Sequence, residues 1–260
     1  MSERPKLAVF KFASCDGCQV SILNLDETLL ALADRVEIAF FLEATSRVDP
    51  GPYDVALVEG SITTPADVAR IEQVRASSRT LITIGACATA GGIQALRNLA
   101  DVEEWKRHVY PHPEWIDALA SSTPIADHVR VDEAIHGCPV DREQVLRVLL
   151  RALLGAASDL PGGPLCLECK RAGHACVVVT KKAPCMGPVT RAGCGALCPS
   201  LGRDCYACFG PADDPNPEAL ADLLARNGDT RRDVALRLRG VAGWDPKFRE
   251  LAGRLEERGD

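Results

Sequence analysis

The twelve cysteines of this 260-residue chain fall into two groups, and this distribution constrains the fold more than any other feature. Four lie between residues 15 and 138, and eight are packed between residues 166 and 208. Three C-x-x-C pairs occur: Cys15/Cys18, Cys166/Cys169 and Cys205/Cys208. Two intervening residues let both sulfurs face one centre, so such pairs hold iron–sulfur clusters or zinc. Twelve thiols are the number that three four-iron clusters require.

A disulfide framework is the first alternative, and the composition disfavours it. Disulfide-rich chains are typically short, secreted and unable to bury a core. This chain is 47% hydrophobic, and its length allows one large domain or two modest ones. Its first ten residues contain no apolar run of signal-peptide length. Zinc is the stronger alternative, because C-x-x-C pairs also build zinc ribbons.

Charge and hydropathy exclude two classes of partner. The formal net charge of −6 argues against a nucleic-acid surface, which rests on clustered lysine and arginine. The longest apolar candidate, near residues 145–157, is interrupted by Arg147 and Arg151, so we expect no membrane span. Because free thiols persist in reducing compartments, we expect a cytoplasmic protein.

The first half of the chain alternates between strand and helix patterns. Strands are predicted at residues 6–12, 36–42, 53–58, 80–84 and 128–131. Helices are predicted at residues 20–32, 64–76, 88–99 and 141–154. The second of these helices begins with Thr64 as its N-cap and Pro65 at the first helical position. This alternation predicts an α/β domain with a parallel, doubly wound sheet.

The early cysteines follow the predicted strands. Cys15 and Cys18 come after the first strand, Cys87 after the fourth and Cys138 after the last. Ligands of open parallel sheets bind outside the carboxyl ends of the strands, so we expect the four thiols to converge there. A zinc ribbon would instead keep its ligands on local hairpins.

Three polar residues stand beside these cysteines. Glu59 ends the third predicted strand and faces the same edge; it either serves the interface or a proton route, or is satisfied by backbone N–H groups. Thr89 and Ser14 are candidate hydrogen-bond donors to cluster sulfurs. We find no dinucleotide or phosphate loop, because residues 85–92 lack the G-x-G-x-x-G spacing.

The second half has a different character. The segment DLPGGP at residues 159–164 marks a boundary, which predicts domains at 1–158 and 159–260. Glycine and proline are dense among the eight later cysteines, so we expect an irregular, Cys-rich domain with short helices, whose folding depends on bound metal. Residues 217–226 and 231–258 predict two or three amphipathic helices that cover it.

Several motifs resemble the small subunit of nickel–iron hydrogenases. They are SCDGC at 14–18, VEGSI at 58–62, GACATAGG at 85–92, GCP at 137–139 and the cysteine run from 166 to 211. Within that family the chain looks most like the delta subunit of the cytoplasmic sulfhydrogenase type, which is linked to NAD(P). The resemblance implies a flavodoxin-like first domain, whose proximal cluster lies near the nickel–iron centre of a separate large subunit.

The resemblance also implies a ligand set for three 4Fe-4S clusters. The proximal cluster would be held by Cys15, Cys18, Cys87 and Cys138. The medial cluster would be held by Cys194, Cys198, Cys205 and Cys208, and the distal cluster by Cys166, Cys169, Cys176 and Cys185. Exchange of a ligand between the medial and distal sets stays open. From their own positions, Glu59 and Thr89 are the candidate residues beside the proximal ligands.

Three positions depart from the family pattern. Cys166 stands where exported members have a histidine, and Cys198 supplies a fourth medial thiol. The added thiolate charge predicts lower reduction potentials, which suit a nicotinamide acceptor. Val140 replaces a frequent second proline after GCP, which makes the local turn harder to predict.

The resulting expectation is an electron-transfer protein with no catalytic residue of its own. Electrons would pass from the large subunit through the three clusters to flavin and iron–sulfur diaphorase subunits. One alternative is the small subunit of a deazaflavin-independent hydrogenase that feeds a heterodisulfide reductase. Another, from a different class, is a zinc-binding interaction module.

Overall fold

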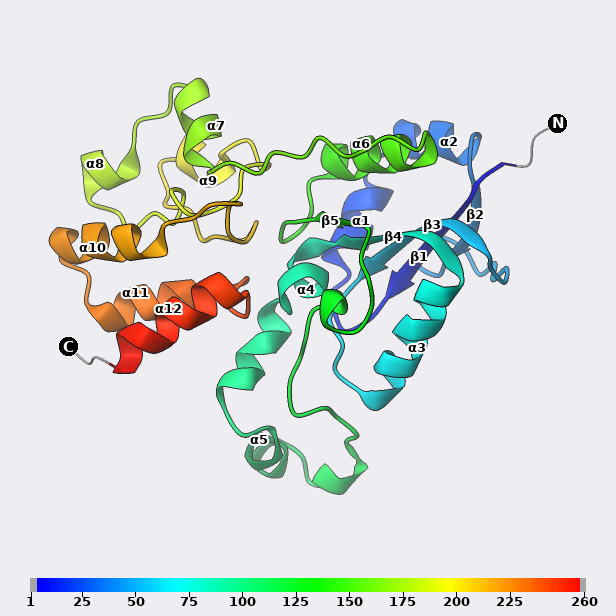
Figure 1. Cartoon of the computed structure of the whole chain (residues 1–260), viewed down its shortest axis with the longest axis horizontal. Coiled ribbons are helices and arrows are strands. Elements are labelled where there is room, and N and C mark those ends of the chain that lie inside the picture. Colours follow the sequence, from blue (N-terminus) through cyan, green and yellow to red (C-terminus); the bar gives the residue numbers. More distant parts are fainter. Residues whose placement is uncertain (1–3, 258–260) are drawn as a thin grey trace. The chain divides into compact units, whose positions relative to one another are not determined.

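The computed structural model describes residues 4–257, which form two compact units (Figure 1). The units meet in the sequence at Asp159 and Leu160, at the start of the DLPGGP segment. Among residues 4–257, no helix is both long and apolar enough to cross a lipid bilayer.

The first unit is built on a five-stranded parallel sheet with the strand order β2-β1-β3-β4-β5. Its strands are β1 (Lys6–Lys11), β2 (Glu37–Phe41), β3 (Tyr53–Glu59), β4 (Ser78–Ile84) and β5 (Glu133–Ile135). This is the flavodoxin-like order, in which β1 and β3 meet at the switch point. The predicted α/β fold with a parallel sheet is confirmed.

The central strand shows why the sheet forms where it does. In β3, residues 55–58 are at most 1% exposed, because both faces of a parallel sheet are covered. Leu57 pairs with Val9 of β1 on one side and with Ile82 of β4 on the other. A continuous apolar run therefore marks a strand buried on both faces.

Helices of the first unit follow the strands (Figure 1). They are α1 (Gly17–Leu23), α2 (Glu27–Ala33), α3 (Pro65–Ala76), α4 (Gly85–Ala90), α5 (Val102–Val109) and α6 (Arg142–Leu153), with 3-10 turns at Ile93–Leu99, Pro113–Trp115 and Ile125–Asp127. Thr64 and Asp67 form a reciprocal capping box at the start of α3. Asp141 caps α6 by accepting from the Gln144 N–H. Both helix starts were predicted, and both are confirmed.

Two predicted helices are interrupted. Residues 20–32 contribute to two helices rather than one, because α1 ends at Leu23 and the backbone of Asp26 has a φ of +50°. The helix predicted at 88–99 ends early, since Gly91 takes a left-handed conformation with a φ of +76° and a 3-10 turn follows.

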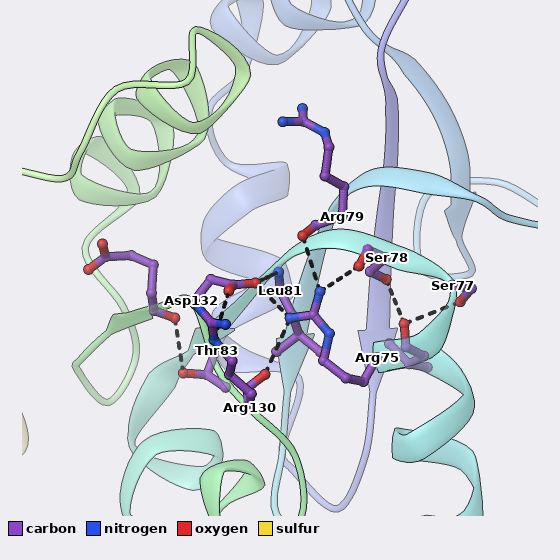
Figure 2. Close-up of polar contacts among 10 residues, drawn as sticks. Arg75, Ser77, Ser78, Arg79, Leu81, Thr83, Arg130 and Asp132 are labelled. Carbon is purple, nitrogen blue, oxygen red and sulfur yellow. Dashed lines mark hydrogen bonds and ion pairs between the residues drawn. The ribbon is translucent and has the colours of Figure 1, made fainter.

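The fifth strand was predicted at residues 128–131, and this was wrong. The strand lies at Glu133–Ile135, because pairing with β4 begins only at Asp132. The carboxylate of Asp132 accepts from the Leu81 N–H at 2.8 Å and from Arg75 at 2.6 Å (Figure 2). Arg75 also donates to the Arg130 carbonyl and thereby holds the preceding residues in a turn.

The second unit contains helices and irregular segments. Its helices are α7 (Cys166–Arg171), α8 (Val177–Lys181), α9 (Leu197–Ser200), α10 (Pro217–Asn227), α11 (Arg231–Leu238) and α12 (Pro246–Glu257). Within residues 160–257 the backbone pairing of strand type is limited to two isolated bridges. The last three helices bury a small core of their own, which includes Leu224, Leu238 and Phe248.

Candidate metal centres

The four early cysteines lie at the carboxyl edge of the sheet. Cys15 is in the loop after β1, and Cys18 is in the first turn of α1. Cys87 is in α4, directly after β4, and Cys138 follows β5. Burial and then the charges of neighbouring thiols raise the pKa of Cys18, Cys87 and Cys138; these neighbours include Cys15, so the four sulfurs lie near one another. Sequence positions more than 120 residues apart thus meet at one place.

Glycines leave room around these sulfurs. A Cβ on Gly92 would lie 2.6 Å from Cys87 Sγ, and one on Gly17 would lie 3.4 Å from Cys15 Sγ. Gly85 has a φ of +87°, and a Cβ there would collide with Cys18 Sγ. The backbone therefore packs directly against the thiols, which fits a bulky centre that accepts N–H groups.

Burial dominates the electrostatics of this group. Burial raises the pKa of Cys18 and Cys138, and it raises the pKa of Cys87 to about 11. Without a cation, these three thiols are neutral at pH 7. A bound metal inverts this preference, because thiols that coordinate a metal are deprotonated. The donor set therefore fits a thiolate-ligated centre.

Glu59 fixes the loop that carries two of the thiols. Its carboxylate is 1% exposed and accepts from the Cys18 N–H at 3.1 Å and from the Gln19 amide at 2.7 Å. Burial raises the pKa of Glu59, against the effect of these two hydrogen bonds. The structure therefore gives Glu59 backbone and amide partners, as one of the two sequence interpretations expected.

The two hydroxyl groups proposed as sulfur donors have other partners. Thr89 donates to the Gly85 carbonyl at 3.0 Å, one helical turn earlier. Ser14 donates to the Asp16 carboxylate at 3.3 Å, and Asp16 also pairs with Lys11.

Gln94 is a site residue that sequence reasoning missed. Its side-chain oxygen lies 3.3 Å from Cys87 Sγ, and its amide donates to the Ala13 carbonyl at 2.7 Å. It therefore ties the loop after β1 to the loop after β4. The only sequence signal is the Gly91-Gly92 pair two residues earlier, which turns the chain back toward Cys87.

Four cysteines of the second unit form one group around α7 and α8. The pKa of Cys166 is raised by burial and by the thiols of Cys185, Cys169 and Cys176. A Cβ on Gly187 would lie 3.4 Å from Cys185 Sγ and 3.6 Å from Cys166 Sγ. This group repeats the glycine-lined packing of the first unit.

The other four cysteines do not form one closed group. Burial and then Cys198 raise the pKa of Cys194, whereas burial and then both Cys185 and Cys208 raise the pKa of Cys205. Burial raises the pKa of Cys205 to about 12. The Cys205 N–H donates to Cys185 Sγ at 3.3 Å, so this half of the segment touches the group around α7 and α8.

All twelve cysteines are free thiols. Within the described part of the chain, no three His, Cys, Asp or Glu side chains are arranged to hold one metal ion.

Comparison with known proteins places the chain in a family. Residues 15–152 match the family described as the NADH ubiquinone oxidoreductase 20 Kd subunit. The sulfhydrogenase 2 subunit delta of Pyrococcus furiosus is 38% identical over 92% of this chain and 100% of that protein. A subunit of the F420-non-reducing hydrogenase vhu of Methanococcus voltae is 31% identical over 88% of this chain and 91% of that protein.

A solved structure agrees with these relatives. A chain in the crystal structure of an NAD+-reducing [NiFe]-hydrogenase is 32% identical, with a TM-score of 0.56, and the match covers 61% of this chain and 96% of that one. The fold and the gathered thiols define an electron-transfer component of a redox complex. The chain belongs to the 20 Kd subunit family and, within it, to the small subunits of nickel–iron hydrogenases.

Proposed function

We propose that this protein relays electrons through three 4Fe-4S clusters, from the large subunit of a cytoplasmic nickel–iron hydrogenase to NAD(P)-linked diaphorase subunits. The observation that carries the proposal is the convergence of Cys15, Cys18, Cys87 and Cys138 on the carboxyl edge of the sheet. Such a set is the cysteine complement of one four-iron cluster.

The proposed ligand assignment gives four thiols to each cluster. The proposed proximal ligands are Cys15, Cys18, Cys87 and Cys138; the distal ligands are Cys166, Cys169, Cys176 and Cys185; and the medial ligands are Cys194, Cys198, Cys205 and Cys208. The distal set is supported by the coupling of its four thiols. The contact between Cys205 and Cys185 supports adjacent medial and distal centres.

The chain's own contribution is to hold and shield these centres. A bound 4Fe-4S cluster supplies reversible one-electron chemistry. Glu59 accepts from the Cys18 N–H, and the Gln94 amide donates to the Ala13 carbonyl in the loop before Cys15, so both residues support the positions of these two thiols. Cys18, Cys185 and Cys205 are buried, which excludes water from one side of each centre. Burial and N–H groups directed at sulfur set the reduction potential.

An apolar surface supports a large-subunit partner. The residues 93–115, which follow the Cys87 loop, expose seven large hydrophobic side chains: Ile93, Leu96, Leu99, Trp105, Val109, Tyr110 and Trp115. Trp115 is 74% exposed, and helix α5 buries none of its side chains. Apolar patches of this kind mark protein–protein interfaces. The large subunit is the proposed occupant, because hydrogenase relatives are named as subunits.

Three observations support the nicotinamide link and the cytoplasmic location. The similar solved structure comes from an NAD+-reducing enzyme. Cys166 and Cys198 give the later clusters full thiolate ligation, which lowers reduction potentials toward that of a nicotinamide. None of the twelve cysteines, all of which the structure describes, forms a disulfide, which supports a reducing compartment.

A second candidate acceptor is a heterodisulfide reductase, which the likeness to the F420-non-reducing hydrogenase favours. Purification of the native complex discriminates between the two. Diaphorase subunits that reduce NAD(P) with hydrogen would support the first candidate, and a reductase of disulfides would support the second.

The direct test is a metal analysis of the protein purified without oxygen. We expect about twelve iron and twelve acid-labile sulfide per chain, with a broad brown absorption, as three four-iron clusters require. Zinc without sulfide would overturn the relay and support an interaction module instead.

A further inference from the structure

Basic residues flank Cys176 along the sequence of the second unit. Lys170 and Arg171 end helix α7, and Lys181 and Lys182 end helix α8. Cys176 is the N-cap residue of α8. All four basic side chains are exposed, and we call them the basic rim.

The basic rim is not neutralised by the chain itself. No ion pair identified within residues 4–257 includes one of its members, whereas Arg191, Arg237 and Arg254 of the same unit each bind a carboxylate. Residues 166–185 carry four basic side chains and one acidic one, a formal charge of +3 on a chain of −6. Lys181 Nζ donates to the Gly202 carbonyl at 2.7 Å, which holds one of these charges in place. Residues 166–185 are therefore a positively charged segment of a protein that is acidic overall.

Exposed apolar side chains lie on the same two helices. Leu167 of α7 is 46% exposed and Val179 of α8 is 80% exposed. Cys176 is exposed, whereas the other seven cysteines of this unit are buried or half-buried. The most exposed cysteine of this unit therefore belongs to the group around α7 and α8. The same two helices expose apolar side chains and basic side chains that have no ion pair within residues 4–257, which is the composition of a docking surface.

We propose that the basic rim, with Leu167 and Val179, is the surface on which an acidic electron-accepting protein docks. The inference rests on the proposed function, because it takes Cys176 as a ligand of the last cluster in the relay. Each transfer moves one electron: the docked protein gains the electron that this chain loses, and no atom is exchanged. Carboxylates on the partner would be steered to the rim before the apolar contacts form.

The test uses the complex of the full chain with its large subunit, with hydrogen as the electron donor. The acceptors are cytochrome b5, an acidic protein, cytochrome c, a basic protein, and methyl viologen, a small cation. The wild-type complex should reduce cytochrome b5 faster than cytochrome c at low salt, and added salt should slow the reduction of cytochrome b5.

The variant R171Q/K182Q removes one charge from each side of Cys176 and leaves the Lys181 contact intact. Its second-order rate with cytochrome b5 should fall by about 3- to 10-fold at low salt, with a weaker salt dependence, while the rate of methyl viologen reduction does not fall. The control R226Q/R232Q removes the same charge from exposed positions on α10 and α11, and should keep the wild-type rates.

Charge reversal separates docking from misfolding. R171E/K182E should retain the iron content of the wild type and shift the preference from cytochrome b5 toward cytochrome c, a gain that damage to the fold does not produce. Equal losses in the variant and the control, or a wild-type complex that reduces both cytochromes equally fast, would overturn the docking surface alone. Absence of iron and sulfide would overturn the proposed function and this inference together.

Discussion

The two units gather cysteines by different means. In the first unit four thiols stand at the ends of strands that bury a continuous apolar core, including Val55, Leu57 and Ile82. In the second unit eight thiols lie among helices of four to six residues, and the backbone there forms only isolated bridges. The first arrangement positions its thiols through the sheet, whereas the second depends on what the thiols bind.

Removal of iron should have the largest effect and should separate the units. After anaerobic chelation, amides of residues 166–208 should lose hydrogen-exchange protection, because metal-dependent domains derive about 10 kcal/mol of folding free energy from their metal. Amides of β3 in the first unit should stay protected. Hydrogen exchange with mass spectrometry measures both. Full protection of residues 166–208 without iron would show that the second unit does not depend on its metal for folding.

A core truncation should act on the first unit alone. Ile82 is fully buried in β4, and Ile82→Ala should lower the free energy of unfolding of this unit by about 2–5 kcal/mol. Urea denaturation of the isolated chain measures the change in the free energy of unfolding, and hydrogen exchange shows which unit has lost protection. Leu30→Ala, at a position 70% exposed, is the matched control and should change little. An equal loss of protection in residues 166–208 would show that the units unfold together.

Substitution of a glycine beside the four early cysteines should lower the iron content more than substitution of a glycine far from any thiol. Gly85→Ala places a Cβ against Cys18 Sγ and forces a left-handed residue, which costs about 1–2 kcal/mol before the collision is counted. We expect the iron content to fall by about four per chain. Gly155→Ala shares the positive φ, at +68°, but meets no atom within 4 Å. If both variants keep full iron, the edge of the sheet does not hold a cluster.

The smallest expected effect concerns the end of the sheet. Burial would raise the pKa of Asp132, but the Leu81 N–H and the Arg75 guanidinium outweigh it and hold the pKa below its ordinary value. The stability from this carboxylate is therefore complete above about pH 4 and is lost as the pH falls through its lowered pKa.

Asp132→Asn should lower the free energy of unfolding at pH 7 by about 1–2 kcal/mol and reduce the difference between pH 7 and pH 3. Chemical denaturation at both pH values measures this. The exposed Asp127→Asn serves as the control. A pH dependence equal to that of the wild type would locate the acid sensitivity elsewhere.

Local pattern was sufficient for much of the first unit. The strands at 53–58 and 80–84 were predicted from short segments rich in strand-forming residues, and the start of α3 from Thr64 and Pro65. The prediction of the fifth strand was wrong because Arg75 and Asp132, which are 57 positions apart, form a contact that holds the chain in a turn. No local pattern reports such a contact.

The sequence by itself determined the fold class, the two groups of cysteines and the family, because strand patterns, ligand chemistry and motifs are local properties of the chain. The tertiary structure alone decided what surrounds the thiols. Gln94 reaches the Ala13 carbonyl across 81 residues, and Glu59 reaches the Cys18 N–H across 41. These partners follow from the order of the strands in the sheet, which brings distant loops to one edge.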